Sequence, residues 1–320
     1  MSGCIRITVH HASMAPARSE DESALALATL RDGDEVDAIF ACTRKERRIA
    51  RTGSPYLDVE LRDASGSIRA RAFRDADVLE GRFARGELVH VRGRVGRYRD
   101  ELQLELDAIA RAPDATEAPE RFLPLAYRDL DELEGFMEHL SREVFDPRLR
   151  ALLDGIADDA DLRADLRRAP CSIPTSPGRA AAPGVHHAYL GGLLEHTVAV
   201  ATPALETCVL HPRLDRDLLI AAALVHDLGK TREFTYGAEI ARSEEGLLLG
   251  HVEIGLRLIR EHAAGSLSGA RLLELEHCVL LHHGPEAASG RRFRTAEAVS
   301  LYRLNQLDAH VKGALETGTF

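Results

Sequence analysis

The sequence predicts an α+β protein of more than one domain, in which a small N-terminal β-barrel precedes an all-helical domain. Between residues 33 and 112, five short segments alternate apolar and polar side chains, as half-buried strands do. Residues 112–124 contain three prolines and several acidic side chains, a composition typical of a linker. Beyond this linker the apolar side chains recur at steps of three and four, which is the spacing of one helix face.

We divide the chain into an N-terminal extension, a barrel, a linker and a helical domain, at residues 1–30, 31–112, 113–125 and 126–320. Strands are predicted at Val36–Phe40, Tyr56–Leu61, Ser67–Phe73, Leu88–Val95 and Leu102–Leu106. After a first helix from Leu130 to Val144, further helices are predicted at 147–168, 189–210, 215–229, 249–263, 270–283 and 295–316. An exposed loop is expected at Pro170–Gly184, and Pro203 should kink or end its helix.

The composition is that of a soluble globular protein. A chain of 320 residues can form two domains with cores of their own, and 45% of its residues are hydrophobic. No segment approaches the roughly 18 uninterrupted apolar residues of a membrane span, and the N-terminus does not resemble a secretory signal. The five cysteines are scattered, which favours the reducing cytoplasm and disfavours disulfides or a thiolate zinc site.

The charge of the chain is unevenly distributed. A net charge of −10 by itself disfavours a nucleic-acid-binding protein. Residues 31–112, however, carry 17 Lys and Arg against 16 Asp and Glu, so the excess of acid lies elsewhere. Lysine occurs only at positions 45, 230 and 312. Because nearly every other cation is arginine, Lys230 stands out.

A series of metal-ligand side chains is spread over the helical half. Imidazole and carboxylate groups are the ligands that borderline divalent metals take, and here they lie in or beside apolar stretches at His196, His226, Asp227, His251, His282, His283 and Asp308. A charged aspartate at the end of the apolar run Leu218–Val225 is costly unless it is paired or bound to a metal. A lone histidine is more often an ordinary core or surface residue, but the ordered series predicts helices that converge on a metal centre.

This order, H…HD…H…HH…D, resembles the signature of the HD superfamily of metal-dependent phosphohydrolases. The resemblance implies two ions bridged by Asp227. The first ion would also be held by His196, His226 and Asp308. The second would be completed by His251, His282 and His283. Mixed ligation by histidine and carboxylate suits several metals. We expect manganese, with iron, zinc or magnesium as alternatives.

Two ions at such a centre can activate a shared water and clamp both oxygens of an in-line phosphoryl displacement. Asp227 would then be catalytic as well as a ligand. The ammonium of Lys230, in His-Asp-Leu-Gly-Lys, has the role of neutralising a phosphate oxygen as charge builds. The alternative for Lys230 is a solvated lysine at the end of a helix.

The barrel segment is similar to nucleic-acid-binding OB-folds, from Leu61 to Ile68 and from Gly86 to Leu104. Such folds follow the phosphate chain with a cationic groove and stack bases on aromatic rings. Arg44, Lys45, Arg47 and Arg48 fall in one predicted loop. We expect the nucleic-acid contacts to be Arg44, Arg47, Arg92, Arg94, Arg97, Tyr98 and Arg99.

A solvated polar face is the alternative for these arginines, because acidic residues are interleaved with them. For Phe40, Tyr56 and Phe73 we expect core packing rather than stacking on bases.

Together the two halves resemble the YhaM-type 3′→5′ exoribonucleases, in which an OB-fold precedes an HD domain. The resemblance covers roughly residues 33–315 and rests on the stretches His186–Thr197, Gly246–His251, His282–Gly284 and Glu297–Ala309. It implies metal-dependent removal of nucleotides from the 3′ end of single-stranded RNA, with DNA as an alternative substrate. His187 would contact substrate phosphate or pack. The chain departs from the family at Asn305 and Leu281, where an acidic residue and a serine are usual.

Two other functions stay open. Other HD proteins hydrolyse free nucleotides or cyclic dinucleotides, although the chain lacks the Gly-Tyr-Pro extension after its paired histidines. A non-catalytic nucleic-acid-binding protein is the third candidate, and the intact ligand series disfavours it. No membrane partner is expected, and the sequence leaves homo-oligomerisation undecided.

Overall fold

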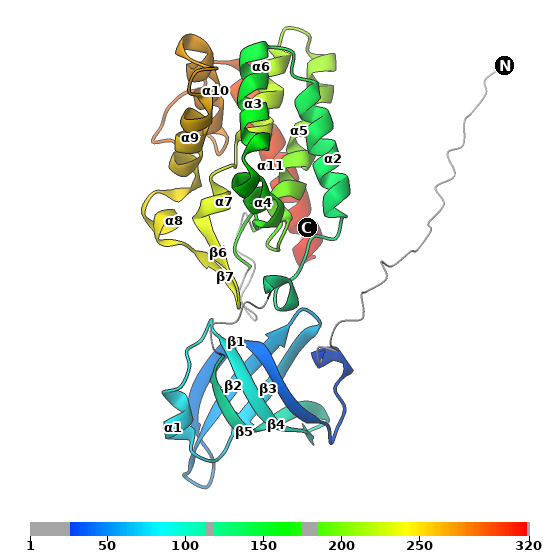
Figure 1. The fold of residues 1–320 in the computed structure, drawn as a ribbon, viewed down its shortest axis with the longest axis vertical. Coiled ribbons are helices and arrows are strands. Elements are labelled where there is room, and N and C mark those ends of the chain that lie inside the picture. Colours follow the sequence, from blue (N-terminus) through cyan, green and yellow to red (C-terminus); the bar gives the residue numbers. More distant parts are fainter. Residues whose placement is uncertain (1–25, 113–117, 175–184, 319–320) are drawn as a thin grey trace, which may run out of the picture.

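The computed structural model describes residues 26–112, 118–174 and 185–318, which form a barrel and a helical body, one below the other in Figure 1. The rest of the predicted extension (residues 1–25), five linker residues (113–117) and most of the predicted Pro170–Gly184 loop (175–184) lie outside the described residues.

Five strands close into the barrel in the order β1-β2-β3-β5-β4. All neighbours are antiparallel except β3 and β5. The elements of this part are η1 Leu27–Thr29, β1 Glu35–Ile49, β2 Pro55–Asp63, β3 Gly66–Ala72, α1 Ala76–Glu80, β4 Leu88–Tyr98 and β5 Glu101–Arg111. Alternate side chains point inward along each strand, so Phe40, Leu57 and Leu104 meet in the barrel core. The predicted fold class is confirmed, since an OB-type barrel precedes a helical domain.

The helical body is more divided than the sequence predicts. Its elements are η2 Pro119–Arg121, α2 Leu130–Arg142, α3 Pro147–Asp158, α4 Ala160–Arg168, α5 Gly192–Leu210, α6 Arg216–Val225, α7 Lys230–Glu233, β6 Phe234–Tyr236, β7 Ile240–Arg242, α8 Glu244–Leu248, α9 Gly250–Ala263, α10 Gly269–Leu281 and α11 Ala296–Thr317. The predicted 147–168 helix is two helices, because Asp159 has an extended backbone and its carboxylate accepts the amide of Leu162 as an N-cap. Pro203 does not end α5, and the hairpin β6–β7 was not predicted.

The two most apolar helices, α5 and α6, form the centre of the helical body. Every residue from Leu218 to Val225 is buried, and α5 packs on α6, α2 and α11. By length and hydropathy α5 could span a membrane, but 56% of its apolar window is buried inside the protein. A buried core helix meets the same criterion, and the contacts of α5 with α6, α2 and α11 are those of a core helix.

The barrel and the helical body meet at the hairpin β6–β7, which extends down toward the barrel in Figure 1. Arg62 of β2 donates through Nη2 to the carbonyl of Ala238 at 3.0 Å. Ala238 also packs with Ala41 and Phe122 in a small apolar cluster. Because α7 runs directly into β6, the barrel docks on a segment that begins at Lys230.

Two glycines of β4 provide a test of the barrel packing. A Cβ on Gly93 would lie 2.2 Å from the carbonyl oxygen of Glu105, whereas a Cβ on Gly96 would meet nothing within 4 Å. We expect Gly93→Ala to lower the free energy of unfolding by about 1–3 kcal/mol through overpacking. Gly96→Ala should change it by less than about 0.5 kcal/mol. Urea denaturation of both variants measures the difference, and equal values would contradict the close contact between β4 and β5.

Candidate metal centre and nucleic-acid interface

Five helices bring the His–Asp series together. His196 lies on α5, His251 on α9 and Asp308 on α11, while the doublets follow directly after α6 and α10. Tight backbone packing holds the carriers in place. A Cβ on Gly229 would lie 2.0 Å from the carbonyl oxygen of His251, so only glycine allows α9 to approach the residues that follow α6.

The histidines present the same ring nitrogen to the centre. The Nδ1 atoms of His226 and His282 lie 2.9 and 2.5 Å from the carbonyls of Ala223 and Val279. The Nδ1 of His251 lies 3.2 Å from Glu233. Each Nδ1 therefore carries the proton, which leaves the Nε2 lone pair free for a metal.

The carboxylate of Asp227 separates the Nε2 atoms into two sets. Its Oδ2 lies 3.3 Å from the Nε2 of both His196 and His226. Its Oδ1 lies 3.3 Å from His282 Nε2 and 3.5 Å from His251 Nε2. His283 joins this second set, with its Nε2 2.9 Å from that of His251.

The second set fits a divalent ion. Asp227 Oδ1 and His282 Nε2 are buried and face each other, yet neither has a hydrogen-bond partner among the residues that the structure describes. Two buried acceptors in this position are costly without a cation between them. Burial lowers the pKa of His282 to about 4, so its imidazole is neutral, as a metal ligand must be. The donor atoms of Asp227, His251, His282 and His283 all lie within 4.8 Å of one another.

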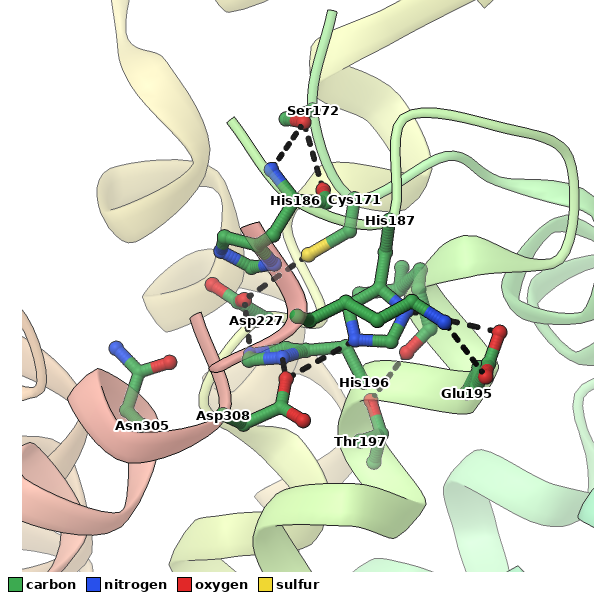
Figure 2. Close-up of polar contacts among 12 residues, drawn as sticks. Cys171, Ser172, His186, His187, Glu195, His196, Thr197, Asp227, Asn305 and Asp308 are labelled. Carbon is green, nitrogen blue, oxygen red and sulfur yellow. Dashed lines mark hydrogen bonds and ion pairs between the residues drawn. The ribbon is translucent and has the colours of Figure 1, made fainter. Parts of the chain in front are cut away.

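Asp308 lies on the outer side of His196. Its Oδ2 is 2.6 Å from Nδ1 of His196 and 3.0 Å from Nε2 of His187. Dashed lines in Figure 2 mark these two contacts. In this structure Asp308 therefore orients His196 rather than facing its Nε2, and direct ligation by Asp308 stays a prediction. His187 is buried, with 2% of its side chain exposed. Its ring packs against Tyr189 and His196, and contact of His187 with substrate phosphate stays a prediction.

Lys230 is not the solvated lysine of the alternative interpretation. It is 5% exposed, and its Nζ lies 2.8 Å from Asp227 Oδ2 and 3.2 Å from the Sγ of Cys171. Burial alone would lower the pKa of Lys230, but the charge of Asp227 raises it above its usual value. Burial would likewise raise the pKa of Asp227, and Lys230 with the neighbouring histidines holds it well below the usual range. Asp227 is thus a carboxylate and Lys230 an ammonium.

Sequence reasoning missed three contacts around this centre. Cys171 contacts Lys230, although no sequence motif around Cys171 indicated a place at this centre. Glu233 is 3% exposed and holds His251, and its place three residues after Lys230 was the available signal. Asn305 is buried and donates through Nδ2 to the carbonyl of His282 at 3.1 Å. The departure at position 305 therefore supplies a contact that a carboxylate could not make.

Comparison with known proteins gives the same two parts. Residues 193–310 match the family model described as the HD domain, and residues 41–110 match the one described as the OB-fold nucleic acid binding domain. The chain is 31% identical to the 3′-5′ exoribonuclease YhaM of Shouchella clausii, over 88% of this chain and 85% of that protein. The proteins of that name from Bacillus velezensis and Bacillus subtilis are 30% and 29% identical, each over 87% of this chain and 85% of their own length. The chain belongs to the YhaM family. As a YhaM-family member it has its whole His–Asp series inside the stretch matched by the HD model, whereas Cys171 and His187 precede that stretch.

The predicted nucleic-acid contacts on β1 point to opposite faces. Arg44 contacts Glu46 and lies 3.7 Å from Asp58, whereas Arg47 pairs with Asp77 of α1. Side chains alternate along a strand, and these residues are in β1 rather than in the loop that was predicted. Arg44 and Arg47 therefore lie on opposite faces of β1, and their contact with nucleic acid stays a prediction.

Around Tyr98 the structure forms a platform that includes residues not selected from the sequence. Tyr56 and Phe73 stack with ring centroids 5.4 Å apart. The guanidinium of Arg71 lies 5.1 Å from the centre of the Tyr98 ring and 5.8 Å from that of Tyr56. Phe73 and Tyr98 are 48% and 50% exposed. The expectation of core packing is correct for Phe40, which is 1% exposed, and wrong for Phe73.

The other selected arginines make local contacts on β4 and its turn. Arg99 lies 5.4 Å from the Tyr98 ring, and Arg97 donates to the carbonyl of Asp100. Arg94 donates to the carbonyl of Gly33. Arg92 is exposed and alternates with buried Val91 and Gly93, so it shares the outer face of β4 with Arg94. These side chains keep most of their donors available to a phosphate chain.

Metal binding should be measurable as stability. The folded protein alone brings Asp227 Oδ1 and His282 Nε2 together, so Mn²⁺ should bind the folded state and not the unfolded one. At 100 times its Kd, Mn²⁺ should therefore raise the free energy of unfolding by about 2.7 kcal/mol. His282→Ala should lose most of this gain. The matched control is His262→Gln, since His262 of α9 is already held by Leu258 and Asp159. Thermal unfolding with and without Mn²⁺ tests this, and an equal shift in both variants would contradict it.

Proposed function

We propose that the protein is a metal-dependent 3′→5′ exoribonuclease that hydrolyses single-stranded RNA to 5′-mononucleotides. The observation that carries this function is the division of the inward Nε2 atoms between the two oxygens of Asp227. Such an arrangement suits two cations that share one carboxylate. The names of its YhaM relatives support RNA as the polymer and the 3′ end as the point of attack.

In this proposal the two sets of residues would hold two ions, with Asp227 common to both sets. His196 and His226 would hold the first, to which Asp308 would contribute by ligation or by orienting His196. His251, His282 and His283 would hold the second. When bound, the ions supply Lewis acidity for the attack of water on a phosphodiester. The histidine and carboxylate donors are compatible with manganese, which we infer as the ion, with iron, zinc and magnesium as alternatives.

The chain's own cation is Lys230. Its ammonium is held at Asp227 Oδ2, in a buried environment that strengthens its field. A phosphate bound beside Asp227 would lie close to this charge. We therefore assign to Lys230 the neutralisation of a phosphate oxygen as the phosphodiester bond breaks. Asp227 holds both Lys230 and the histidines in position for that step.

The barrel holds the RNA in this proposal. The platform of Tyr56, Phe73, Tyr98 and Arg71 provides ring faces and a guanidinium for stacking. Unpaired bases are needed for such stacking, which favours a single strand. The described cysteines Cys42, Cys171, Cys208 and Cys278 are all free, which fits a cytoplasmic protein.

The reaction can be followed on 5′-labelled single-stranded RNA with Mn²⁺. Wild type should give a ladder that shortens from the 3′ end. Asp227→Ala should lose activity by more than roughly 100-fold, since even contacts outside the ligand shell are worth 10- to 100-fold. Asp161→Ala is the matched control, because Asp161 is an exposed aspartate of the same domain.

Other outcomes of this assay decide between the remaining functions. Intact RNA together with hydrolysed free nucleotides or cyclic dinucleotides would replace the exonuclease by a nucleotide phosphohydrolase. Binding of RNA without cleavage under every metal would indicate a non-catalytic protein. Faster shortening of single-stranded DNA than of RNA would overturn the assigned polymer.

The platform predicts a loss that depends on substrate length. Base stacking on an aromatic ring contributes about 1–3 kcal/mol per base. Phe73→Ala and Tyr98→Ala should therefore each raise KM for a long RNA by roughly 5- to 160-fold, the factor that corresponds to this energy, with kcat on a dinucleotide unchanged. Phe145→Ala serves as the control, because Phe145 is 72% exposed on the helical domain. Equal losses on both substrates, measured by steady-state kinetics, would rule against the platform.

A further inference from the structure

The stretch from His186 to His196 contains more buried polar groups than the two metal sets need. His187 is 1% exposed and Glu195 is 7% exposed; His187 contacts Asp308, and Glu195 contacts Tyr189. We propose that His187, Tyr189, Glu195 and Lys312 form a positioning relay that fixes Asp308 against His196. This inference rests on the proposed metal centre, to which it adds a second layer of residues.

The relay is a continuous chain of hydrogen bonds. Lys312 of α11 donates through Nζ to Glu195 Oε1 at 3.2 Å. The hydroxyl of Tyr189 donates to the other oxygen of Glu195 at 2.7 Å. The same hydroxyl lies 2.9 Å from Nδ1 of His187. The chain therefore runs from a cation near the surface to the imidazole of His187.

The far end of the relay is Asp308. His187 Nε2 lies 3.0 Å from Asp308 Oδ2, the oxygen that also lies 2.6 Å from His196 Nδ1. In Figure 2 the rings of His187 and His196 both approach Asp308. Because Asp308 then accepts the proton on His196 Nδ1, the Nε2 of His196 is left as a lone pair toward Asp227. The relay thus controls which nitrogen of His196 reaches the centre.

The backbone of His187 has an unusual conformation. His187 has a φ of +48°, a left-handed conformation that is costly for a residue other than glycine. A Cβ on Gly192 would lie 2.1 Å from the carbonyl oxygen of His187, so the start of α5 packs directly on this residue. The amide of His187 also donates to Glu316 of α11 at 3.2 Å. Strain held by contacts on both sides indicates a position that the fold fixes for function.

The lysine at the other end distinguishes the relay from ordinary core packing. Lys312 keeps 23% of its side chain exposed and lies 5.5 Å from the centre of the Tyr189 ring. Glu195 is thereby neutralised at one oxygen while the other oxygen holds Tyr189. A carboxylate without this cation would be a costly buried charge. The relay therefore connects α5, α11 and the segment before α5 through polar contacts.

The test measures Mn²⁺ affinity of the full chain by calorimetry, without RNA. His187→Ala should weaken binding about 10- to 100-fold, and His187→Gln should recover part of it, because its amide can still donate to Asp308. Tyr189→Phe removes the shared hydroxyl alone and should weaken binding less. In the His187→Ala background, Tyr189→Phe should add nothing, since the relay is already broken. With RNA, kcat should fall and KM should stay unchanged.

Tyr236→Phe is the matched control, as Tyr236 is a half-buried tyrosine of β6 outside the relay. Wild-type Mn²⁺ affinity in His187→Ala and Tyr189→Phe, with a lower melting temperature only, would overturn the relay as a positioning device. Independent losses that add in the double variant would do the same. If wild type binds no divalent ion, the proposed metal centre itself fails, which is a separate result from loss of the relay.

Discussion

The burial of one charged carboxylate constrains the whole helical domain. Asp227 is 2% exposed at the end of the apolar helix α6, where an isolated charge would be strongly destabilising. Lys230 compensates one oxygen, and histidines from three other helices face both. Helices α5, α9 and α10 must therefore pass or end beside Asp227, and this requirement determines how they pack around α6.

Close backbone contacts provide the accuracy that such a centre needs. Gly229 allows α9 to approach the residues after α6, and Gly192 allows α5 to rest on His187. The short helix α7 then leads from Lys230 into the hairpin that docks on the barrel. One continuous segment thus has Lys230 at its start and the contact with the nucleic-acid-binding barrel at its end, so it connects the barrel directly to the candidate metal centre.

How far the sequence was sufficient differs between the two parts. The ligand series was predictable because histidines and an aspartate in apolar helices are costly without a shared partner. The contact of Asp308 with Nδ1 of His196 was not predictable, because a sequence does not indicate which ring nitrogen of a histidine faces which partner. On the barrel, the sequence placed Arg44 and Arg47 in one loop, whereas in the structure they belong to β1, which continues to Ile49, so their side chains point to opposite faces of the strand. Stacking of Tyr56 on Phe73 depends on the pairing of β2 with β3.

The sequence by itself determined the order of the two domains, the apolar periods of strands and helices, and the residue types of the metal centre. These depend on local spacing and on the chemistry of single side chains. Only the tertiary structure decided which atoms face each other: the two oxygens of Asp227, the inward Nε2 atoms and the relay from Lys312 to Asp308. The reason is physical, since the direction of a side chain is set by the packing of helices far apart in the chain, and a shift of about one ångström there changes which atoms are within hydrogen-bond reach.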